Sequence, residues 1–115
     1  MTKRSFSAKG ERAKEPLELV HTDVCRPLNV QARSGYEYFV NFIDDYSRYS
    51  YIYLMQRKSE TFHKFQEFRA EAEKQLGKSL KTLRSDRGGE YLDTEFTDHL
   101  IENEILLQLS APGNP

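Results

Sequence analysis

Between residues 17 and 55 the apolar positions follow the spacing of β-strands. Residues 17–24 alternate and then run apolar, as a strand with one or both faces covered does, and Pro27 ends the run. Residues 38–44 and 49–55 are rich in β-branched and aromatic side chains, and the turn-prone residues 45–48 separate them. The first half of the chain is therefore predicted to form one strand followed by a β-hairpin.

From residue 59 the apolar spacing becomes helical. Apolar side chains recur three or four positions apart, with charged residues between them, at Phe62, Phe65, Phe68, Ala72 and Leu76. Ser59 is the expected N-cap of this helix and Gly77 its expected end. A row of phenylalanines on one helical face is usually a core face, so we expect it to pack on the sheet rather than to stack on bases.

The remaining segments complete an alternating pattern. Residues 80–85 predict a strand, residues 94–103 a helix with Phe96, Leu100 and Ile101 inward, and residues 105–109 a last strand before a loop. The expected order is β-β-β-α-β-α-β. Crossover helices make the last two strands parallel to a neighbour, so the fold class is α/β with a mixed sheet.

Composition and charge limit the classes of function. The 115 residues suit one small domain, no apolar run is long enough to span a bilayer, and a lone Cys25 can form neither an internal disulfide nor a zinc site. We therefore expect a soluble, intracellular protein that holds any metal mainly through oxygen. The net charge is −1, yet residues 1–16 carry five basic and two acidic groups. Such a tail is more often a solvated linker than a DNA-binding arm.

Two aspartates are candidate metal ligands because of their positions. Asp23 lies within an apolar strand, and Asp86 ends a strand directly before Arg87 and two glycines. On adjacent parallel strands both carboxylates would converge at one sheet end, where hard oxygen ligands suit Mg²⁺ or Mn²⁺. The alternative is local: a strand-end aspartate often caps a turn or pairs with arginine, and Arg84 and Arg87 are close.

Four segments share their order and spacing with a known family. They are LVHTDV at residues 19–24, YFVNFIDDYSRY at 38–49, LRSDRGGEY at 83–91 and QLSAP at 108–112. Together they resemble the integrase catalytic core of copia-type retrotransposons, within the retroviral integrase superfamily. The resemblance covers residues 16–115. Residues 1–16 resemble the linker that follows a zinc-binding domain in this family, which leaves residues 17–115 as the N-terminal part of the core.

The resemblance implies a ribonuclease H-like fold and a polynucleotidyl transferase that trims a DNA end and joins its 3′-hydroxyl to target DNA. The family holds two divalent ions, Mg²⁺ or Mn²⁺, with an Asp, Asp, Glu triad, and Asp23 and Asp86 match its first two positions. The implied partners are the element's DNA ends, target DNA and further copies of the full-length protein. The implied location is the nucleus.

The third carboxylate is where the chain departs from the family. The family's glutamate follows the second aspartate by about 35 residues, whereas Pro115 lies 29 residues after Asp86, so the core is expected to be incomplete at its C-terminus. Glu90, Glu95, Glu102 and Glu104 do not match that position. The chain is thus expected to be a fragment of an integrase or, alternatively, an inactive remnant or DNA- or partner-binding module. A plain metal-dependent nuclease is the third possibility.

Other polar residues receive ordinary structural expectations. Asp44 and Asp45 are expected to form the hairpin turn, and Cys25 to be a small buried residue. His21 is expected to be packed and hydrogen-bonded, although it shares a strand face with Asp23. Arg26 replaces the family's usual glycine, so the turn after the first strand must avoid a positive φ or carry strain.

Overall fold

Five strands form one mixed sheet in the computed structural model, which describes residues 12–26, 35–86, 91 and 93–109. The strand order is β3-β2-β1-β4-β5. β1 (Val20–Cys25), β2 (Tyr38–Asp44) and β3 (Ser50–Met55) form an antiparallel meander. β4 (Thr82–Ser85) runs parallel to β1, and β5 (Leu106–Leu109) parallel to β4. The predicted order and mixed sheet are confirmed.

β1 begins three residues later than the apolar pattern predicted. Leu17 is buried and has a φ of 66°, a left-handed conformation that leaves the strand path. Its N–H donates to Asp44 Oδ1 at 2.8 Å, and its carbonyl accepts from the N–H of Lys81 at 3.0 Å. Through these two hydrogen bonds, the segment before β1 is attached both to the hairpin turn and to the residue that precedes β4.

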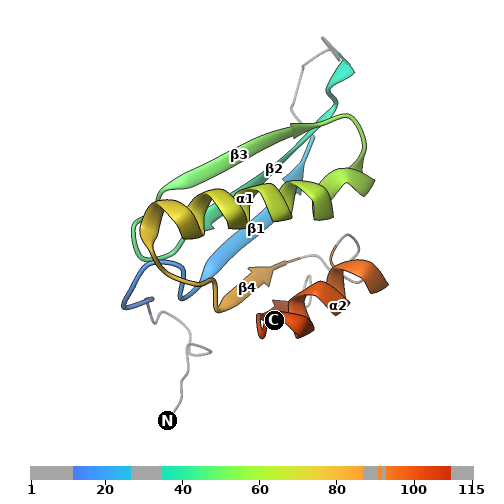
Figure 1. The fold of residues 1–115 in the computed structure, drawn as a ribbon. Helices are drawn as coiled ribbons and strands as arrows, with labels where there is room; N and C mark the ends of the chain where they lie inside the picture. Colours follow the sequence, from blue (N-terminus) through green and yellow to red (C-terminus); the bar gives the residue numbers. More distant parts are fainter. Residues whose placement is uncertain (1–11, 27–34, 87–90, 92, 110–115) are drawn as a thin grey trace, which may run out of the picture.

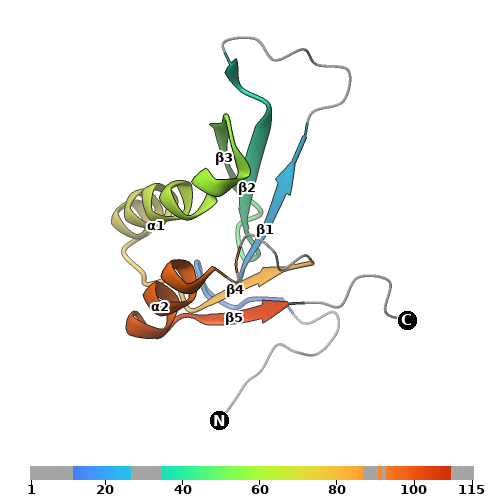
Figure 2. The same cartoon turned by 90° about the vertical axis from the view of Figure 1, so that its right-hand side faces the viewer.

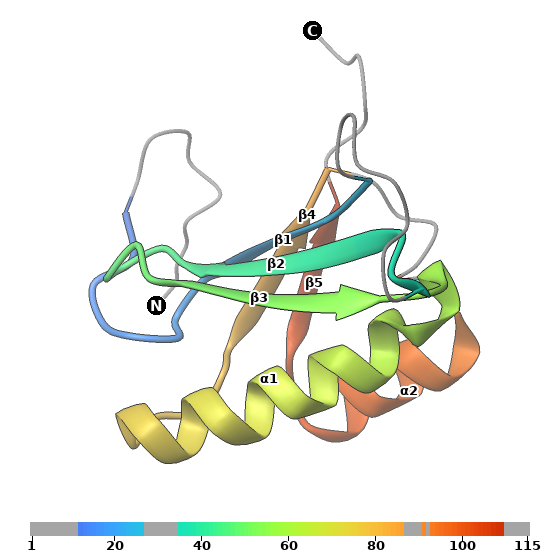
Figure 3. The same ribbon diagram turned by 90° about the horizontal axis from the view of Figure 1, so that it is seen from above.

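Both helices cover the same face of the sheet (Figures 1, 2 and 3). They are α1 (Thr61–Leu76) and α2 (Thr94–Glu102), and Gly77 ends α1 in a left-handed conformation as predicted. Ser59 as N-cap was wrong, because it lies inside the short 3-10 helix η2 (Lys58–Glu60). The Glu60 carboxylate accepts from the N–H groups of Gln56 and Arg57, so an acidic side chain reaching backwards satisfies the backbone here.

The core is an aromatic layer between the sheet and α1. Phe65 and Phe68 are fully buried, and the Phe68 ring stacks on Phe42 with centroids 4.4 Å apart. Phe62, a member of the row expected to pack on the sheet, is only partly buried and packs on Phe96. Ile101 was wrongly placed inward: it is 72% exposed, because Phe96 and Leu100 define the inward face of α2 and the next residue is turned by about 100°.

The other face of the sheet, which we call the open face, is covered by no described helix (Figure 2). Directly paired residues on neighbouring strands point to the same side, so register defines its members. His21 pairs with Ile43 and Arg84, and Asp23 pairs with Asn41. The row continues onto β3, where Ile52 and Leu54 are more than half exposed.

Candidate metal centre

Asp23 and Asp86 lie side by side at the carboxyl ends of two adjacent parallel strands. The β1–β4 register pairs His21 with Arg84 and then Thr22 with Ser85, and each aspartate is the next residue. Neighbouring strands lie about 4.8 Å apart, so the two carboxylates can reach a common point. The predicted placement of the pair is confirmed, whereas its role as a ligand pair stays a prediction.

The two aspartates share one shallow hollow on the open face. Its volume is about 210 Å³, and its lining includes His21, Asn41 and Arg84 besides the two aspartates. Both aspartates are exposed. Thr22, between His21 and Asp23, is buried, and its hydroxyl lies 2.9 Å from the hydroxyl of buried Tyr91. Strand alternation therefore sends the threonine into the core and the carboxylate to the solvent side.

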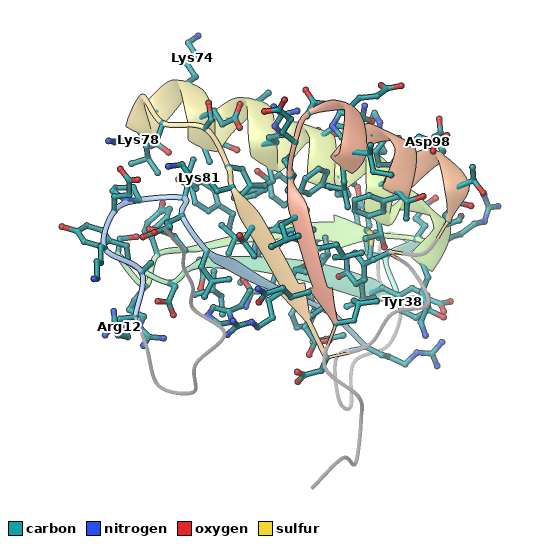
Figure 4. All side chains as sticks on the ribbon, turned by 90° about the horizontal axis from the view of Figure 1, so that it is seen from below. Arg12, Tyr38, Lys74, Lys78, Lys81 and Asp98 are labelled. Carbon is teal, nitrogen blue, oxygen red and sulfur yellow. The ribbon has the colours of Figure 1, made fainter. Side chains whose placement is uncertain are left out.

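This hollow lies at the carboxyl end of β4 and is level with Asn41, in the middle of β2. Tyr38, the first residue of β2, lies at one end of the sheet, whereas Arg12, Lys78 and Lys81 lie at the opposite end (Figure 4). There the Glu15 carboxylate accepts from Lys78 at 2.9 Å and from Lys81 at 3.1 Å. The acidic pair and this lysine cluster thus occupy different ends of the molecule.

The donor set at the hollow suits a hard cation. It consists of two carboxylates and an amide, which are the oxygen ligands that Mg²⁺ and Mn²⁺ accept. Within the described part of the chain no group of three His, Cys, Asp or Glu side chains could hold a metal ion.

In the alternative to metal binding, Asp86 would pair with Arg84 or Arg87. Arg84 Nε and Nη2 both donate to Gln108 Oε1, at 2.9 and 2.7 Å, across the β4–β5 pair. Arg87 and Glu90 lie outside the described residues. Arg84 is thus held along the open face beside the hollow by a neutral acceptor on the edge strand.

His21 both lines the hollow and has a fixed partner. Its Nε2 lies 2.9 Å from Asp45 Oδ1, and the imidazole is about one-third exposed. Asp45 is buried and also accepts from the N–H of Ala13 at 2.7 Å. The expected hydrogen-bonded histidine is confirmed, and its ring is in addition oriented beside Asp23 by a buried carboxylate.

The two aspartates of the hairpin turn have different tasks. Asp44 Oδ2 accepts from the N–H and the hydroxyl of Ser47, as a turn-forming aspartate does. Asp44 Oδ1 in addition accepts from the N–H of Leu17, whereas the hydrogen bonds of Asp45 lie outside the turn, to Ala13 and His21. Burial acts to raise the pKa of Asp45, but hydrogen bonds from Ala13 and His21 and the nearby Arg48 charge outweigh it, so the pKa lies below its ordinary value.

Two further expectations near the site have clear outcomes. Cys25 is only half-buried rather than buried, and desolvation together with the Asp23 charge raises the pKa of its thiol, which keeps it protonated. Arg26 has no positive φ, so the arginine itself avoids the backbone strain that its replacement of glycine could have caused. Its guanidinium donates to the Tyr38 hydroxyl at 2.8 Å and lies 5.0 Å from the centre of that ring.

Asn41 and Arg84 had not been identified as residues of the hollow from the sequence. Asn41 is one polar residue in the run Tyr38–Asp44, where alternation alone marks it as outward-facing. Only the pairing of Asp23 with Asn41 shows that it borders the acidic pair. The usable signal was its polarity between the apolar neighbours Val40 and Phe42, but pairing register cannot be obtained from the residues alone.

A larger hollow, of about 700 Å³, lies between the N-terminal ends of α1 and α2. Lys58, Phe62, His63 and Asp93 are among its lining residues. The Asp93 carboxylate accepts from the N–H of Glu95 and so caps α2. The acidic group of Asp93 is therefore explained by helix capping, and the smaller hollow at Asp23 is the better candidate for chemistry.

None of the described helices has the length and apolar character needed to cross a bilayer.

Comparison with known proteins identifies the family. The model of the integrase core domain matches residues 13–115. The chain is 41% identical over 111 residues to the retrovirus-related Pol polyprotein from transposon TNT 1-94 of Nicotiana tabacum, covering 96% of this chain and 8% of that protein. It is 30% identical over 110 residues to the Pol polyprotein from transposon RE2 of Arabidopsis thaliana, covering 96% and 7%. The chain thus spans less than a tenth of these relatives.

Solved structures support the fold independently. One neighbour is the simian T-cell lymphotropic virus intasome in complex with PP2A regulatory subunit B56 gamma, with a TM-score of 0.70 and 18% identity over 91% of this chain and 36% of that chain. Another is the dimeric HTLV-2 integrase catalytic core domain in complex with magnesium, with a TM-score of 0.66 and 19% identity over 85% and 63%. The fold is ribonuclease H-like, as the resemblance implied. The chain therefore belongs to the integrase core domain family and is related to the Pol polyproteins of copia-type retrotransposons.

Proposed function

We propose that this chain is the N-terminal part of a retrotransposon integrase core that acts in DNA integration by 3′-end processing and strand transfer. The observation that carries the proposal is the placement of Asp23 and Asp86 as adjacent carboxylates at the ends of β1 and β4, on the open face. The relatives are Pol polyproteins of transposons, which agrees with this task. Such a protein would act in the nucleus on DNA, as an assembly of several copies.

Asp23 and Asp86 would hold the Mg²⁺ or Mn²⁺ that the reaction requires. Bound there, divalent ions would activate the attacking oxygen and stabilise the leaving oxygen of a phosphodiester. The two residues fit this role because both are exposed carboxylates, which provide hard, anionic oxygens at one strand end. The HTLV-2 integrase core, one of the structural neighbours, is described in complex with magnesium.

The chain itself would position the two carboxylates and keep them accessible to DNA. The hydrogen-bonded β1–β4 pair sets the spacing of the two carboxylates, and the core beneath it, with Val20 and Leu83 fully buried, keeps that pair rigid. The open face leaves the carboxylates accessible to a DNA backbone. Arg84 and His21, each held by a partner, border the same hollow and place positive or hydrogen-donating groups beside it.

The test is a DNA strand-transfer assay on three proteins measured side by side. They are the 115-residue chain, a longer form extended through a helix with glutamate about 35 residues after Asp86, and the longer form with Asp86→Asn. The extended protein should join labelled DNA ends in the presence of Mg²⁺. The short chain should show no strand transfer, because two carboxylates leave the two metal ions without the third protein ligand of the triad. Asp86→Asn should reduce joining to background, because an amide is a poor, uncharged ligand.

A matched control separates the site from a general loss of acidic charge. Asp98 is exposed on α2, away from the hollow, and Asp98→Asn makes the same chemical change there (Figure 4). The extended Asp98→Asn protein should join DNA as well as the unsubstituted form. Joining that survives Asp86→Asn would place the reaction elsewhere. Joining by the short chain would show that the third ligand has been wrongly assigned, and silence of the extended form would favour an inactive remnant.

A further inference from the structure

We infer that Asn41 is a positioning residue for the metal ion at Asp23, with its side-chain oxygen accepting a hydrogen bond from a water of the ion's hydration shell. This inference rests on the proposed function and assigns it a residue outside the carboxylate triad. Three oxygen-bearing side chains lie in a row across the open face at the same level of the sheet. Asn41 on β2 pairs directly with Asp23 on β1, and Asp86 follows on β4.

The Asn41 oxygen lacks the partner that a buried acceptor needs. Among the described residues, Asn41 Oδ1 is the one buried side-chain polar atom without a hydrogen-bond partner. Buried polar atoms are normally satisfied, so an orphaned acceptor beside a hollow indicates that a donor is supplied from outside the protein. Asn41 lines the hollow that contains both aspartates, which places the orphaned group at the candidate metal centre.

The chemistry of its neighbours shows what kind of donor fits. The side chains of directly paired residues begin about 5 Å apart, and here one carries a carboxylate and the other an amide oxygen without a partner. Two acceptors cannot bond to each other, so they require a cation or a donor between them. On β3 Asn41 pairs with Ile52, and Ile43 follows two residues later on the same face of β2; neither side chain can donate a hydrogen bond.

A hydrated divalent ion meets this requirement. Mg²⁺ keeps several of its waters when one or two carboxylates bind it, and those polarised waters are strong donors. The terminal torsion of asparagine is broad, so Oδ1 can turn toward the hollow without displacement of β2. Outer partners of this kind orient a site, and their loss typically weakens metal affinity by about tenfold or more.

The test measures Mn²⁺ binding, not activity. Mn²⁺ is titrated into the 115-residue chain, and its affinity is read from the paramagnetic broadening of backbone amide signals of β1. Asn41→Leu, which has a similar shape but no acceptor, should bind Mn²⁺ about tenfold more weakly. Asn41→Asp, which keeps an oxygen in place, should bind at least as tightly as the unsubstituted chain. Asn103→Leu, at the end of α2 and away from the hollow, is the matched control and should leave the affinity unchanged.

A second readout excludes a purely structural role. Without metal, Asn41→Leu should melt at the same temperature as the unsubstituted chain or higher, because it removes a buried acceptor that has no partner. A lower melting temperature with unchanged Mn²⁺ affinity would overturn the inference, as would an equal loss of affinity in Asn41→Leu and Asn41→Asp. Asp23→Asn separates the two proposals. If Asp23→Asn abolishes Mn²⁺ binding while Asn41→Leu leaves the affinity unchanged, only the Asn41 role fails. If Asp23→Asn binds Mn²⁺ normally, the metal centre itself fails.

Discussion

The two faces of the sheet are built on opposite principles. The face under α1 and α2 is an aromatic layer in which Phe42, Phe65 and Phe68 are fully buried and contact one another. The open face carries half-exposed Ile52 and Leu54 together with two charged aspartates and an amide without a partner. Burial of apolar side chains on the covered face stabilises the fold, whereas the exposed groups of the open face contribute little to stability.

Because the two faces differ in this way, substitutions can change the stability of the fold and the chemistry of the site independently. Alternation along β1 and β4 lets buried Thr22 and Ser85 hold the sheet while their neighbours Asp23 and Asp86 face solvent. Substitutions on the covered face should therefore act on folding, and substitutions on the open face on ligand binding. Three changes test this division, from the largest expected effect on stability to the smallest.

Phe65→Ala should have the largest effect. Phe65 has no exposed surface and contacts Phe42, Phe68 and Phe96, so truncation leaves a cavity in the aromatic layer. The expected loss is about 3 to 5 kcal/mol of unfolding free energy, enough to unfold a domain of this size. Circular dichroism during thermal and urea unfolding measures the loss.

Phe62 provides the matched control for that change, because it lies on the same helix but is only partly buried. Phe62→Ala should cost about 1 to 2 kcal/mol, in proportion to the smaller apolar area removed from water. Equal losses at the two positions would contradict the view that the layer beneath α1 dominates stability, and an unchanged melting temperature for Phe65→Ala would mean that its ring is exposed.

Asp45→Asn should have an intermediate and pH-dependent effect. The amide keeps the shape but replaces one acceptor oxygen with a donor that faces either the N–H of Ala13 or His21. We expect a loss of about 1 to 3 kcal/mol at neutral pH. Urea unfolding of both proteins at about pH 7 and about pH 3 measures the difference.

The sign of the pH effect follows from the depressed pKa of Asp45. A carboxyl whose pKa is lower in the folded state stabilises the fold above its unfolded pKa, here near 3.8, and that contribution is lost as the pH falls through the folded value. The gap between the two proteins should therefore be full above about pH 5 and shrink in stronger acid. A gap that widened in acid would show that the Asp45 carboxylate does not stabilise this fold.

Ile52→Thr should have the smallest effect. Ile52 is 57% exposed on the open face, and threonine keeps the β-branched shape that strands favour. Its unfolding free energy should change by no more than about 0.5 kcal/mol. The matched change on the covered face is Val40→Thr, which buries a hydroxyl and should cost about 1 to 3 kcal/mol by the same measurement. Similar losses at both positions would mean that the open face is covered in solution.

Residue patterns were sufficient for the order of the elements and for the acidic pair. The strand and helix spacings predicted every element of the sheet, and the crossover through α1 explains why β4 lies parallel to β1. Parallel neighbours end at the same edge, so Asp23 and Asp86 could be placed together without coordinates. Their identification as family positions depended on motif resemblance, since two strand-end aspartates alone are also compatible with turn capping.

The errors and omissions came from features that sequence spacing does not determine. Ile101 is apolar and adjacent to Leu100, but packing on one inward face left it outside. Ser59 is a good capping residue, yet Glu60 made the capping contacts. Asn41 and the His21–Asp45 pair depend on strand register and on a contact 24 residues apart in the chain, both of which arise only when the sheet assembles.

The attachment of residues 12–17 to the hairpin turn also has a mechanical consequence. The N–H of Ala13 is bonded to Asp45 and the N–H of Leu17 to Asp44, both ahead of the first residue of β1. Tension applied to the chain from its N-terminal side would therefore load the β2–β3 turn before it reached Asp23. In a pulling experiment these two bonds would act as a strain relief, and the spacing of the acidic pair would be maintained until they ruptured.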